Sequence, residues 1–334
     1  MTPQLAADAE PSPERQDVWQ GEGFGLALQG SYPVLGIAER EGNNEADSTR
    51  LLLGDALTPA EARGGERLRE VRYPDGRVAM TIDDHGGLGL RIAAAEFGEH
   101  EISRDGRTIR SCPAAGLPAW RWQRLLIGQT LPLAAALRGL ELLHASAVTV
   151  GGTAFAFAGE SGAGKSSLAA QLVLRGNPLL AEDVLAVSLD ANGRPQAHPG
   201  SAALSLRHED AGLAERLVRN GMATATGSDE KEHVLVSSAQ RSVPLGAVYL
   251  LSRKGAVEEP IGEARVATLL DLMGCAYVLY LGTQSRLTAQ LSVQAAITQH
   301  CSIVPVNVGS GLSSELLAGE LEAHMTSIAS ARRQ

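Results

Sequence analysis

Aromatic residues and lysines are scarce in this sequence of 334 residues. Aromatic side chains make up 4% of the chain, and its three lysines are Lys165, Lys231 and Lys254. The formal net charge is −9, so the chain lacks the excess of positive charge that a general nucleic-acid binder needs for its phosphate contacts. We therefore expect no nucleic-acid partner.

Cysteines and long apolar runs are also few. Cys112, Cys275 and Cys301 are widely spaced, in a pattern that fits neither a zinc site nor a disulfide framework. We interpret them as reduced thiols of a cytoplasmic protein. No apolar run reaches the roughly 18 residues that span a bilayer, because Arg138 and Glu141 interrupt the best candidate. The sequence thus predicts a cytoplasmic protein without a membrane partner.

The length favours two domains, and the N-terminal part has the features of a β-rich one. Residues 1–17 are acidic and contain prolines, without the basic start and apolar core of a signal peptide, so we expect a disordered lead-in. Over residues 18–118, short apolar stretches alternate with turn signals, which is typical of a meandering antiparallel sheet. We expect strands at 77–82 and 89–93 and a hairpin at 101–110.

The pattern changes after residue 118. Apolar residues at helical spacing predict a helical connection over 119–143, and a domain of alternating strands and helices follows over 144–330. The expected strands are 153–158, 179–187, 234–237, 246–252 and 303–308. The expected helices are 165–175, 266–280, 289–300 and 313–329.

A phosphate-binding loop is the strongest chemical signal. Residues 159–166 fit the pattern G-x-x-x-x-G-K-[ST], between a predicted apolar strand and a predicted helix, which makes a chance glycine-rich turn the weaker interpretation. Backbone amides of such a loop wrap phosphate oxygens, the lysine reaches the β- and γ-phosphates, and the hydroxyl binds Mg²⁺. The expected nucleotide-binding residues are Gly159, Glu160, Ser161, Gly162, Ala163, Gly164, Lys165, Ser166 and Ser167, with Ser166 also a metal ligand.

Two acidic residues follow in the next predicted strand. Glu182 and Asp183 lie near its end, where one of them can face the nucleotide. A carboxylate there can hold Mg²⁺, which we assign to Asp183, and a second can accept the proton of an attacking hydroxyl. The alternative is a solvated acidic strand end.

Other polar residues are candidates with open alternatives. We expect His144 at the end of the linking helix, where it serves either general acid–base chemistry or phosphate contact, or a structural role. Lys231 either reaches a phosphate or is solvated. The guanidinium that steadies the transferring phosphoryl group is expected from Arg207, Arg253 or Arg286, among which the sequence does not choose.

Three blocks of the sequence together resemble the HPr serine kinase family: residues 143–148, 158–166 and 180–184, in matching order and spacing. The resemblance implies an α/β P-loop kinase domain related to phosphoenolpyruvate carboxykinase, preceded here by the β-rich domain. It implies that ATP and Mg²⁺ serve to phosphorylate a serine hydroxyl of a protein or peptide. In it His144 matches the family's histidine and Glu182-Asp183 a pair usually written Asp-Asp, so Glu182, Asp183, His144 and Lys165 are the expected catalytic residues. It also suggests homo-oligomers, which the residue pattern does not show.

The departures from that family narrow the expected acceptor. The glycine-rich second signature, with an Arg-Gly-Leu-Gly core, is absent, and residues 199–207 have different chemistry. The chain is most similar to HPr kinase-related proteins that resemble lasso-peptide and other peptide-modification kinases, which suggests a biosynthetic peptide serine as acceptor. The alternatives are a nucleotide-dependent binding module without phosphotransfer and a small-molecule kinase.

Overall fold

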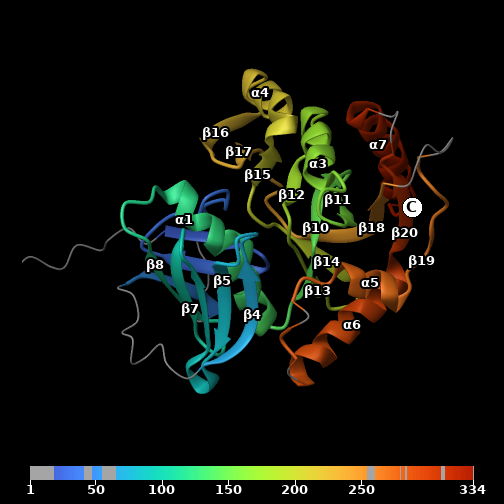
Figure 1. Ribbon diagram of the computed structural model, residues 1–334. Coiled ribbons are helices and arrows are strands. Elements are labelled where there is room, and N and C mark those ends of the chain that lie inside the picture. The colour runs from blue at the N-terminus through green and yellow to red at the C-terminus, as the bar shows by residue number, and fades with distance from the viewer. Residues whose placement is uncertain are drawn as a thin grey trace, which may run out of the picture.

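The computed structural model describes residues 19–40, 47–54, 65–253, 260–278, 280–282, 284–309 and 313–333. It is a mixed α/β structure with two lobes, an N-terminal sheet and a second sheet with helices on both faces (Figure 1). The lead-in expected over residues 1–17 lies outside the described residues. None of the described helices is both long and apolar enough to cross a membrane.

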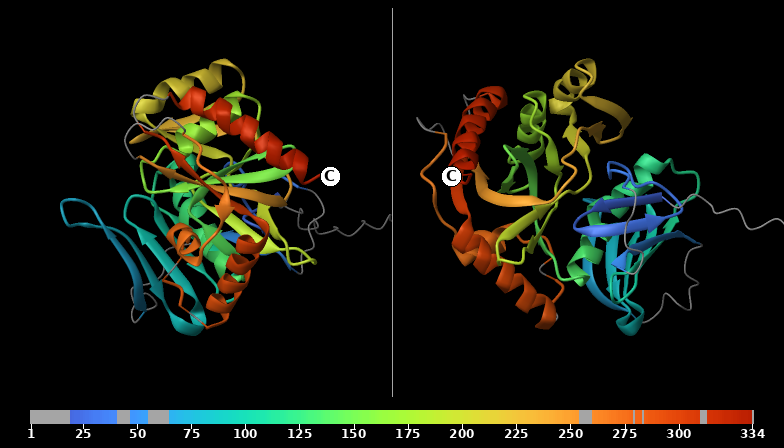
Figure 2. Two further views of the ribbon diagram at one scale, coloured as in Figure 1. Left: turned by 90° about the vertical axis from the view of Figure 1, so that its right-hand side faces the viewer. Right: turned by 180° about the vertical axis from the view of Figure 1, so that it is seen from behind.

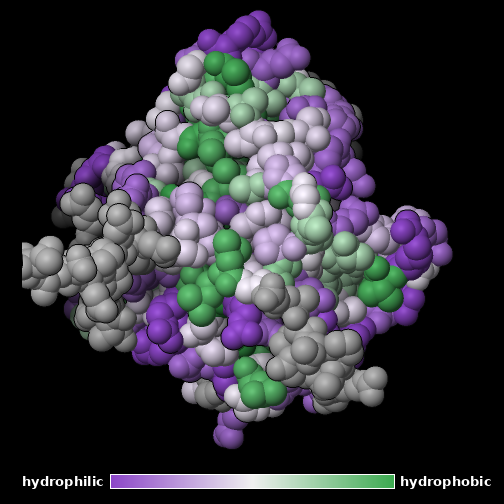
Figure 3. Space-filling view, turned by 90° about the vertical axis from the view of Figure 1, so that its left-hand side faces the viewer, coloured by the Kyte–Doolittle hydropathy of each residue, from purple (hydrophilic) through white to green (hydrophobic). Residues whose placement is uncertain are grey.

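The N-terminal lobe is built on an eight-stranded sheet in the order β1-β2-β3-β8-β7-β6-β5-β4. Neighbouring strands are antiparallel except that β3 runs parallel to both β2 and β8. On the side shown in Figure 3, apolar patches lie among hydrophilic residues. The strands are β1 (Trp19–Gly23), β2 (Leu26–Gly30), β3 (Thr49–Leu53), β4 (Glu66–Arg72), β5 (Val78–Asp84), β6 (Leu90–Ala94), β7 (Gly98–Ile102) and β8 (Thr108–Pro113).

The strands predicted at 77–82 and 89–93 are confirmed as β5 and β6, and the predicted hairpin is formed by β7 and β8. A helical segment packs into the same apolar cluster. It consists of α1 (Ala119–Leu125), a π-helical turn (Leu126–Thr130) and α2 (Leu131–Leu137).

The prediction that this helical connection continues to residue 143 is wrong. Gly139 adopts φ +91°, which glycine reaches without steric cost and which ends the helix just beyond Leu137. Glu141–Leu143 is instead the strand β9, which pairs with β13 (Leu185–Leu189). A short apolar run fits both the helical and the strand period, so the sequence pattern does not distinguish them. Pairing with β13 makes this segment a strand.

The second lobe is built on a nine-stranded sheet. Its main path is β12-β10-β11-β18-β14-β13-β9, and β20 joins β18 and carries β19. β11 runs parallel to β18, and β18 runs parallel to β20. Besides β9 and β13, the strands are β10 (Ala145–Val150), β11 (Thr153–Gly159), β12 (Leu179–Ala181), β14 (Pro195–His198), β18 (Val243–Ser252), β19 (Arg265–Val266) and β20 (Ser302–Asn307).

Side-chain size alternates along β11, and this alternation fits the two faces of the sheet. Phe155 and Phe157 pack into the cluster that contains α3 and α7, whereas Ala154, Ala156 and Ala158 face the cluster of α5 and α6. The helices therefore lie on opposite faces (Figure 2). They are α3 (Lys165–Leu174), α4 (Ala211–Arg219), α5 (Leu269–Cys275), α6 (Gln284–His300) and α7 (Ser314–Ala331).

Most of the elements expected in this lobe are confirmed, with two corrections. The predicted strand 179–187 is broken into β12 and β13, and the predicted helix 266–280 is the shorter α5, which Thr268 caps and which ends at Cys275. Hydrophobic periodicity did not reveal the break in the strand, because this break depends on a left-handed residue, Asp183 at φ +63°.

A small third sheet stands beside α3 and α4 and contacts the N-terminal lobe. Its order is β15-β17-β16, with β15 (Ala203–Arg207), β16 (Ala223–Ser228) and β17 (Lys231–Val236). The α1 helix reaches this sheet through Arg124, which forms an ion pair with Asp229, and through Trp120, whose ring lies 5.6 Å from that of His233. The N-terminal lobe thereby supports one wall of the cavity described next.

Candidate nucleotide and phosphotransfer site

The loop between β11 and α3 has a conformation that needs its glycines. Gly159, Gly162 and Gly164 have φ values of +156°, +82° and +96°. A Cβ added at Gly159 would lie 2.6 Å from the carbonyl oxygen of Leu251 on the neighbouring strand. Side chains at these positions would strain the backbone, so this loop conformation requires the glycines of the sequence motif.

The loop leads into a helix N-terminus that is open to an anion. The N-cap of α3 is Gly164, which has no side chain to cap the helix, and the first turn contains no acidic residue. Lys165 is buried, and its Nζ donates to the carbonyl oxygens of Gly159 (2.9 Å) and Glu160 (3.2 Å). Burial lowers the pKa of Lys165, which the charges of Asp183 and Glu182 oppose. The positive end of a helix together with a buried ammonium group is a phosphate-binding arrangement.

Glu182 is tied to the first turn of the same helix. The Ser166 hydroxyl donates to Glu182 Oε1 at 2.6 Å, and the Ser146 hydroxyl donates to Oε2 at 2.9 Å. Burial raises the pKa of Glu182 to about 7, and the Asp183 charge adds to this, while the two hydroxyls act in the opposite direction. This carboxyl group therefore changes protonation near neutral pH.

Asp183 and His144 lie together at the edge of the cavity. The left-handed Asp183 turns the chain between β12 and β13, with its side chain about half exposed. His144 Nδ1 lies 3.0 Å from the Asp183 carbonyl oxygen and 3.4 Å from Oδ1, and its ring stacks 6.1 Å from that of Tyr277. His144 follows β9 and precedes β10, so its expected position at the end of a helix is wrong although it does line the cavity.

Cationic side chains also line this cavity. A Cβ added at Gly162 would lie 3.4 Å from Arg207 Nη2, and one added at Gly164 would lie 3.9 Å from Arg253 Nη2. Arg207 and Lys231 are direct partners in the β15–β17 register, and both line the cavity. Like charges placed opposite each other repel, so this pair favours an anion between them.

One cavity thus contains most of the residues expected at the site. Gly159, Glu160 and Ala163 of the loop do not line it; Ala163 is buried, and Glu160 is exposed. Glu182 does not line it either and reaches it only through its hydrogen bond from Ser166. The predicted residues that the cavity brings together are His144, Ser161, Gly162, Gly164, Lys165, Ser166, Ser167, Asp183, Arg207, Lys231 and Arg253.

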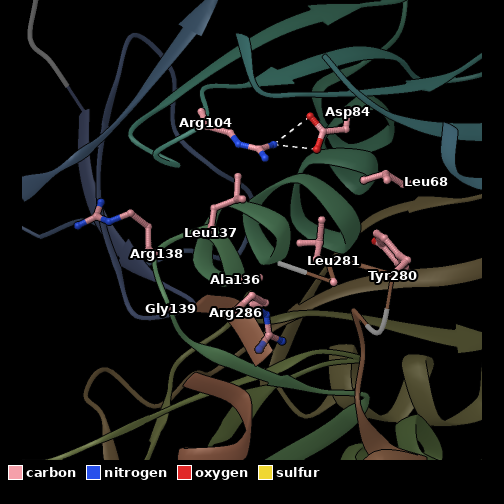
Figure 4. A pocket seen from close by; sticks show the side chains of 11 residues that line it. Leu68, Asp84, Arg104, Ala136, Leu137, Arg138, Gly139, Tyr280, Leu281 and Arg286 are labelled. Atoms are coloured by element: carbon pink, nitrogen blue, oxygen red, sulfur yellow. Dashed lines mark hydrogen bonds and ion pairs between the residues drawn. The ribbon is translucent and has the colours of Figure 1, made fainter. Parts of the chain in front are cut away.

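Arg286, one of the three candidates for the charge at the transferring phosphoryl group, does not line this cavity, whereas Arg207 and Arg253 do. Arg286 lines a separate, larger cavity of about 430 Å³ between the lobes, where the ion pair of Asp84 and Arg104 forms part of the wall (Figure 4). Its Nη2 lies 2.8 Å from Glu141 Oε2, and both side chains are buried. Arg286 is thus paired within the core and not at the loop.

Sequence reasoning missed several residues around the site. Ser146 holds Glu182, Asp210 accepts a hydrogen bond of 2.5 Å from Ser167, and Tyr277 stacks on His144. Ser146 had a detectable signal, because it is a hydroxyl residue in an apolar strand beside a motif. Asp210 and Tyr277 are distant in sequence and are brought to the site only by the fold.

The residues present fit a nucleotide with a divalent cation. Within the part of the chain that the structure describes, no group of three or more histidine, cysteine or acidic side chains is arranged to hold a metal ion. Mg²⁺ in nucleotide sites typically takes one or two protein ligands and completes its shell with phosphate oxygens and water. Ser166 and Asp183 are oxygen ligands suited to this limited role.

Comparisons with known proteins complete the description. The sequence matches no family model and none of the curated proteins. Among solved structures, the fold is similar to the HPr(Ser) kinase/phosphatase from Coxiella burnetii, with a TM-score of 0.33 and 11% sequence identity over 58% of this chain and 95% of that chain. A likeness at this level carries no argument about function, which must come from the residues of the site.

Proposed function

We propose that this chain is an ATP-dependent serine kinase that transfers the γ-phosphoryl group of ATP to a serine hydroxyl of a protein or peptide. The observation that carries the proposal is the convergence on one cavity of the phosphate-binding loop, the exposed carboxylate of Asp183 and the cations Arg207, Lys231 and Arg253. Phosphoryl transfer needs these components: a phosphate cradle, a metal ligand or base, and positive charge near the transferring group.

The phosphates would be held by the loop amides and Lys165. In the structure Lys165 donates to two loop carbonyls, which are the partners it would exchange for phosphate oxygens. Ser166 and Asp183 would hold Mg²⁺, which would neutralise charge on the phosphates. The helix N-terminus of α3 adds a favourable dipole.

The carboxylates Glu182 and Asp183 would share metal binding and proton transfer. Asp183 is about half exposed at the edge of the cavity, where an incoming hydroxyl can reach it. Glu182 has a pKa near 7, in the range that suits a general base at neutral pH, and Ser166 and Ser146 fix its orientation. His144 lies against Asp183 and would position it.

The resemblance of three sequence blocks to the HPr serine kinases supports a serine of a protein or peptide as the acceptor. The departures in residues 199–207 favour a peptide over HPr itself. The cavity edge at Asp183 is open to solvent, as a macromolecular serine requires.

The test is phosphorylation of serine-containing peptides by the purified protein with ATP and Mg²⁺, followed by mass spectrometry. Lys165→Ala should abolish transfer, whereas Arg219→Ala, which removes an exposed cation on α4 far from the loop in sequence, should not change it. Undiminished transfer by Lys165→Ala would remove the basis of the proposal.

A second variant separates proton transfer from nucleotide binding. Glu182→Gln keeps the shape of the side chain and should retain ATP binding while lowering transfer by roughly a hundredfold, the scale of a positioned general base. Near-normal transfer by the double variant Glu182→Gln, Asp183→Asn would refute the role of the pair.

A further inference from the structure

A chain of three polar side chains leads from the cavity wall into the third sheet. The Ser205 hydroxyl lies 2.9 Å from His233 Nδ1, and His233 Nε2 lies 2.9 Å from Asp229 Oδ1. The ionised carboxylate can only accept, so Nε2 carries the ring proton and Nδ1 accepts the proton of the serine hydroxyl. This is the order of hydrogen bonds in which a base activates a nucleophilic serine.

The strand register places this serine beside the phosphate-binding groups. Ser205 pairs with His233 across β15 and β17, and Arg207 pairs with Lys231 one step further along the same face. Leu204 points to the opposite face and is fully buried. Ser205, Arg207 and Lys231 all line the cavity that contains Lys165.

The carboxylate and the imidazole are held in place from the N-terminal lobe. Arg124 forms an ion pair with Asp229 through Oδ2, while Oδ1 accepts from His233 Nε2 and from the Lys231 backbone amide. Trp120 covers the His233 ring at 5.6 Å with a tilt of 34°. The ring therefore has a fixed orientation toward Ser205.

The protonation states also suit a base. Burial lowers the pKa of His233, although Asp229 raises it, which favours the neutral ring whose Nδ1 accepts from the Ser205 hydroxyl. Burial raises the pKa of Asp229, but His233 and Arg124 outweigh it and lower that pKa overall. The carboxylate can stabilise the imidazolium that forms when His233 takes a proton.

We infer that Ser205 is itself a phosphoacceptor, activated by His233 and Asp229, and that the chain phosphorylates its own Ser205. This inference rests on the proposed function, because the nucleoside triphosphate is the phosphoryl donor. Ser205 Oγ would form a bond to the γ-phosphorus while the bond from that phosphorus to the bridging oxygen breaks and the nucleoside diphosphate leaves. The hydroxyl proton passes to His233 Nδ1 and then to solvent.

A second histidine-bonded serine provides a matched control. Ser188 Oγ lies 2.7 Å from His198 Nε2, and His198 Nδ1 lies 2.7 Å from the Ser242 hydroxyl rather than from a carboxylate. Ser188 lies in β13 and does not line the cavity of Lys165. A hydrogen bond to histidine is thus present at both serines, but the carboxylate and the phosphate site are present only at Ser205.

The experiment incubates the full chain with Mg²⁺ and ATP labelled in the γ-phosphate, without a peptide, and maps the phosphate by tandem mass spectrometry. We expect one phosphate at Ser205, with a rate per molecule independent of protein concentration, since acceptor and donor share one cavity. Ser205→Ala should remove the label, Ser188→Ala should retain it, and Ser205→Thr should move it to threonine. His233→Gln should lower the initial rate about a hundredfold with nucleotide affinity unchanged.

The outcomes separate the two claims. Nucleotide binding by calorimetry without phosphate at position 205 would overturn this inference alone, as would a label that persists in Ser205→Ala. Absence of nucleotide binding would overturn the proposed function and this inference together. If His233→Gln does not fold, the change from phosphoserine to phosphothreonine in Ser205→Thr still decides the site.

Discussion

The buried ion pair of Arg286 and Glu141 predicts a loss of stability when Arg286 is replaced, with no loss of ATP affinity. The side chains are 5% and 0% exposed, and Arg286 Nη2 lies 2.8 Å from Glu141 Oε2. The other oxygen, Oε1, accepts from Gln290 at 3.0 Å and from Gln294 at 3.1 Å. The perturbation is Arg286→Met, which keeps a long side chain but removes the charge.

The expected loss in the free energy of unfolding comes from the Glu141 carboxylate, which remains buried without its partner. Without the guanidinium, Glu141 would be a fully buried charge held by two neutral amides, and breaking a buried pair in this way costs about 3–5 kcal/mol. The double variant Arg286→Met, Glu141→Gln removes both charges. It should recover most of the loss, because replacing a whole buried pair is often close to neutral.

The assay is urea denaturation of both variants and the wild type at pH 7, with ATP affinity measured on the folded proteins. We expect unchanged affinity, because Arg286 does not line the cavity that contains Lys165. A loss below about 1 kcal/mol, the value of an exposed pair, would refute the reasoning. So would a double variant as unstable as the single one, or a clear loss of ATP affinity.

Two further predictions concern metal dependence and pH. Asp183→Asn should weaken binding of ATP with Mg²⁺, and high Mg²⁺ should restore part of the affinity in titration calorimetry; a defect that no Mg²⁺ concentration relieves would contradict metal binding by Asp183. His100 is buried, and burial lowers its pKa from 6.5 to about 3, so the unfolded chain binds the proton first as pH falls. Stability should be unaffected by His100 above pH 6.5 and should decrease between pH 6.5 and 3, by about 1.4 kcal/mol per pH unit more than in His100→Gln; equal slopes in urea denaturation would contradict this.

The position of the glycine-rich loop between a strand and a helix was predictable because its signal is local. A short motif, a preceding apolar strand and a following helix are all read from neighbouring residues, and the structure has β11, the loop and α3 in that order. The antiparallel strands of the N-terminal lobe had the same advantage, since turn residues such as Asp105-Gly106 lie between them.

Other features depend on partners distant in sequence and were not predictable from local patterns. The segment Glu141–Leu143 is a strand because β13 pairs with it, and Arg286 is paired within the core because Glu141 is buried beside it. The break between β12 and β13 depends on the left-handed backbone of Asp183. An aspartate tolerates this conformation, but its presence in the sequence does not predict it. The contact of Ser205 with His233 required knowledge of the register of the third sheet.

The measurement that tests the central claim most directly is calorimetric titration of the protein with ATP and Mg²⁺, for the wild type and Lys165→Ala. A hydrogen bond to a charged group contributes about 1.5–3 kcal/mol, so loss of the ammonium group should weaken ATP affinity about tenfold or more. Removal of Mg²⁺ with a chelator should weaken binding by the wild type as well. Equal affinities of wild type and Lys165→Ala would contradict the assignment of the loop at residues 159–166 as the site of nucleotide phosphate binding.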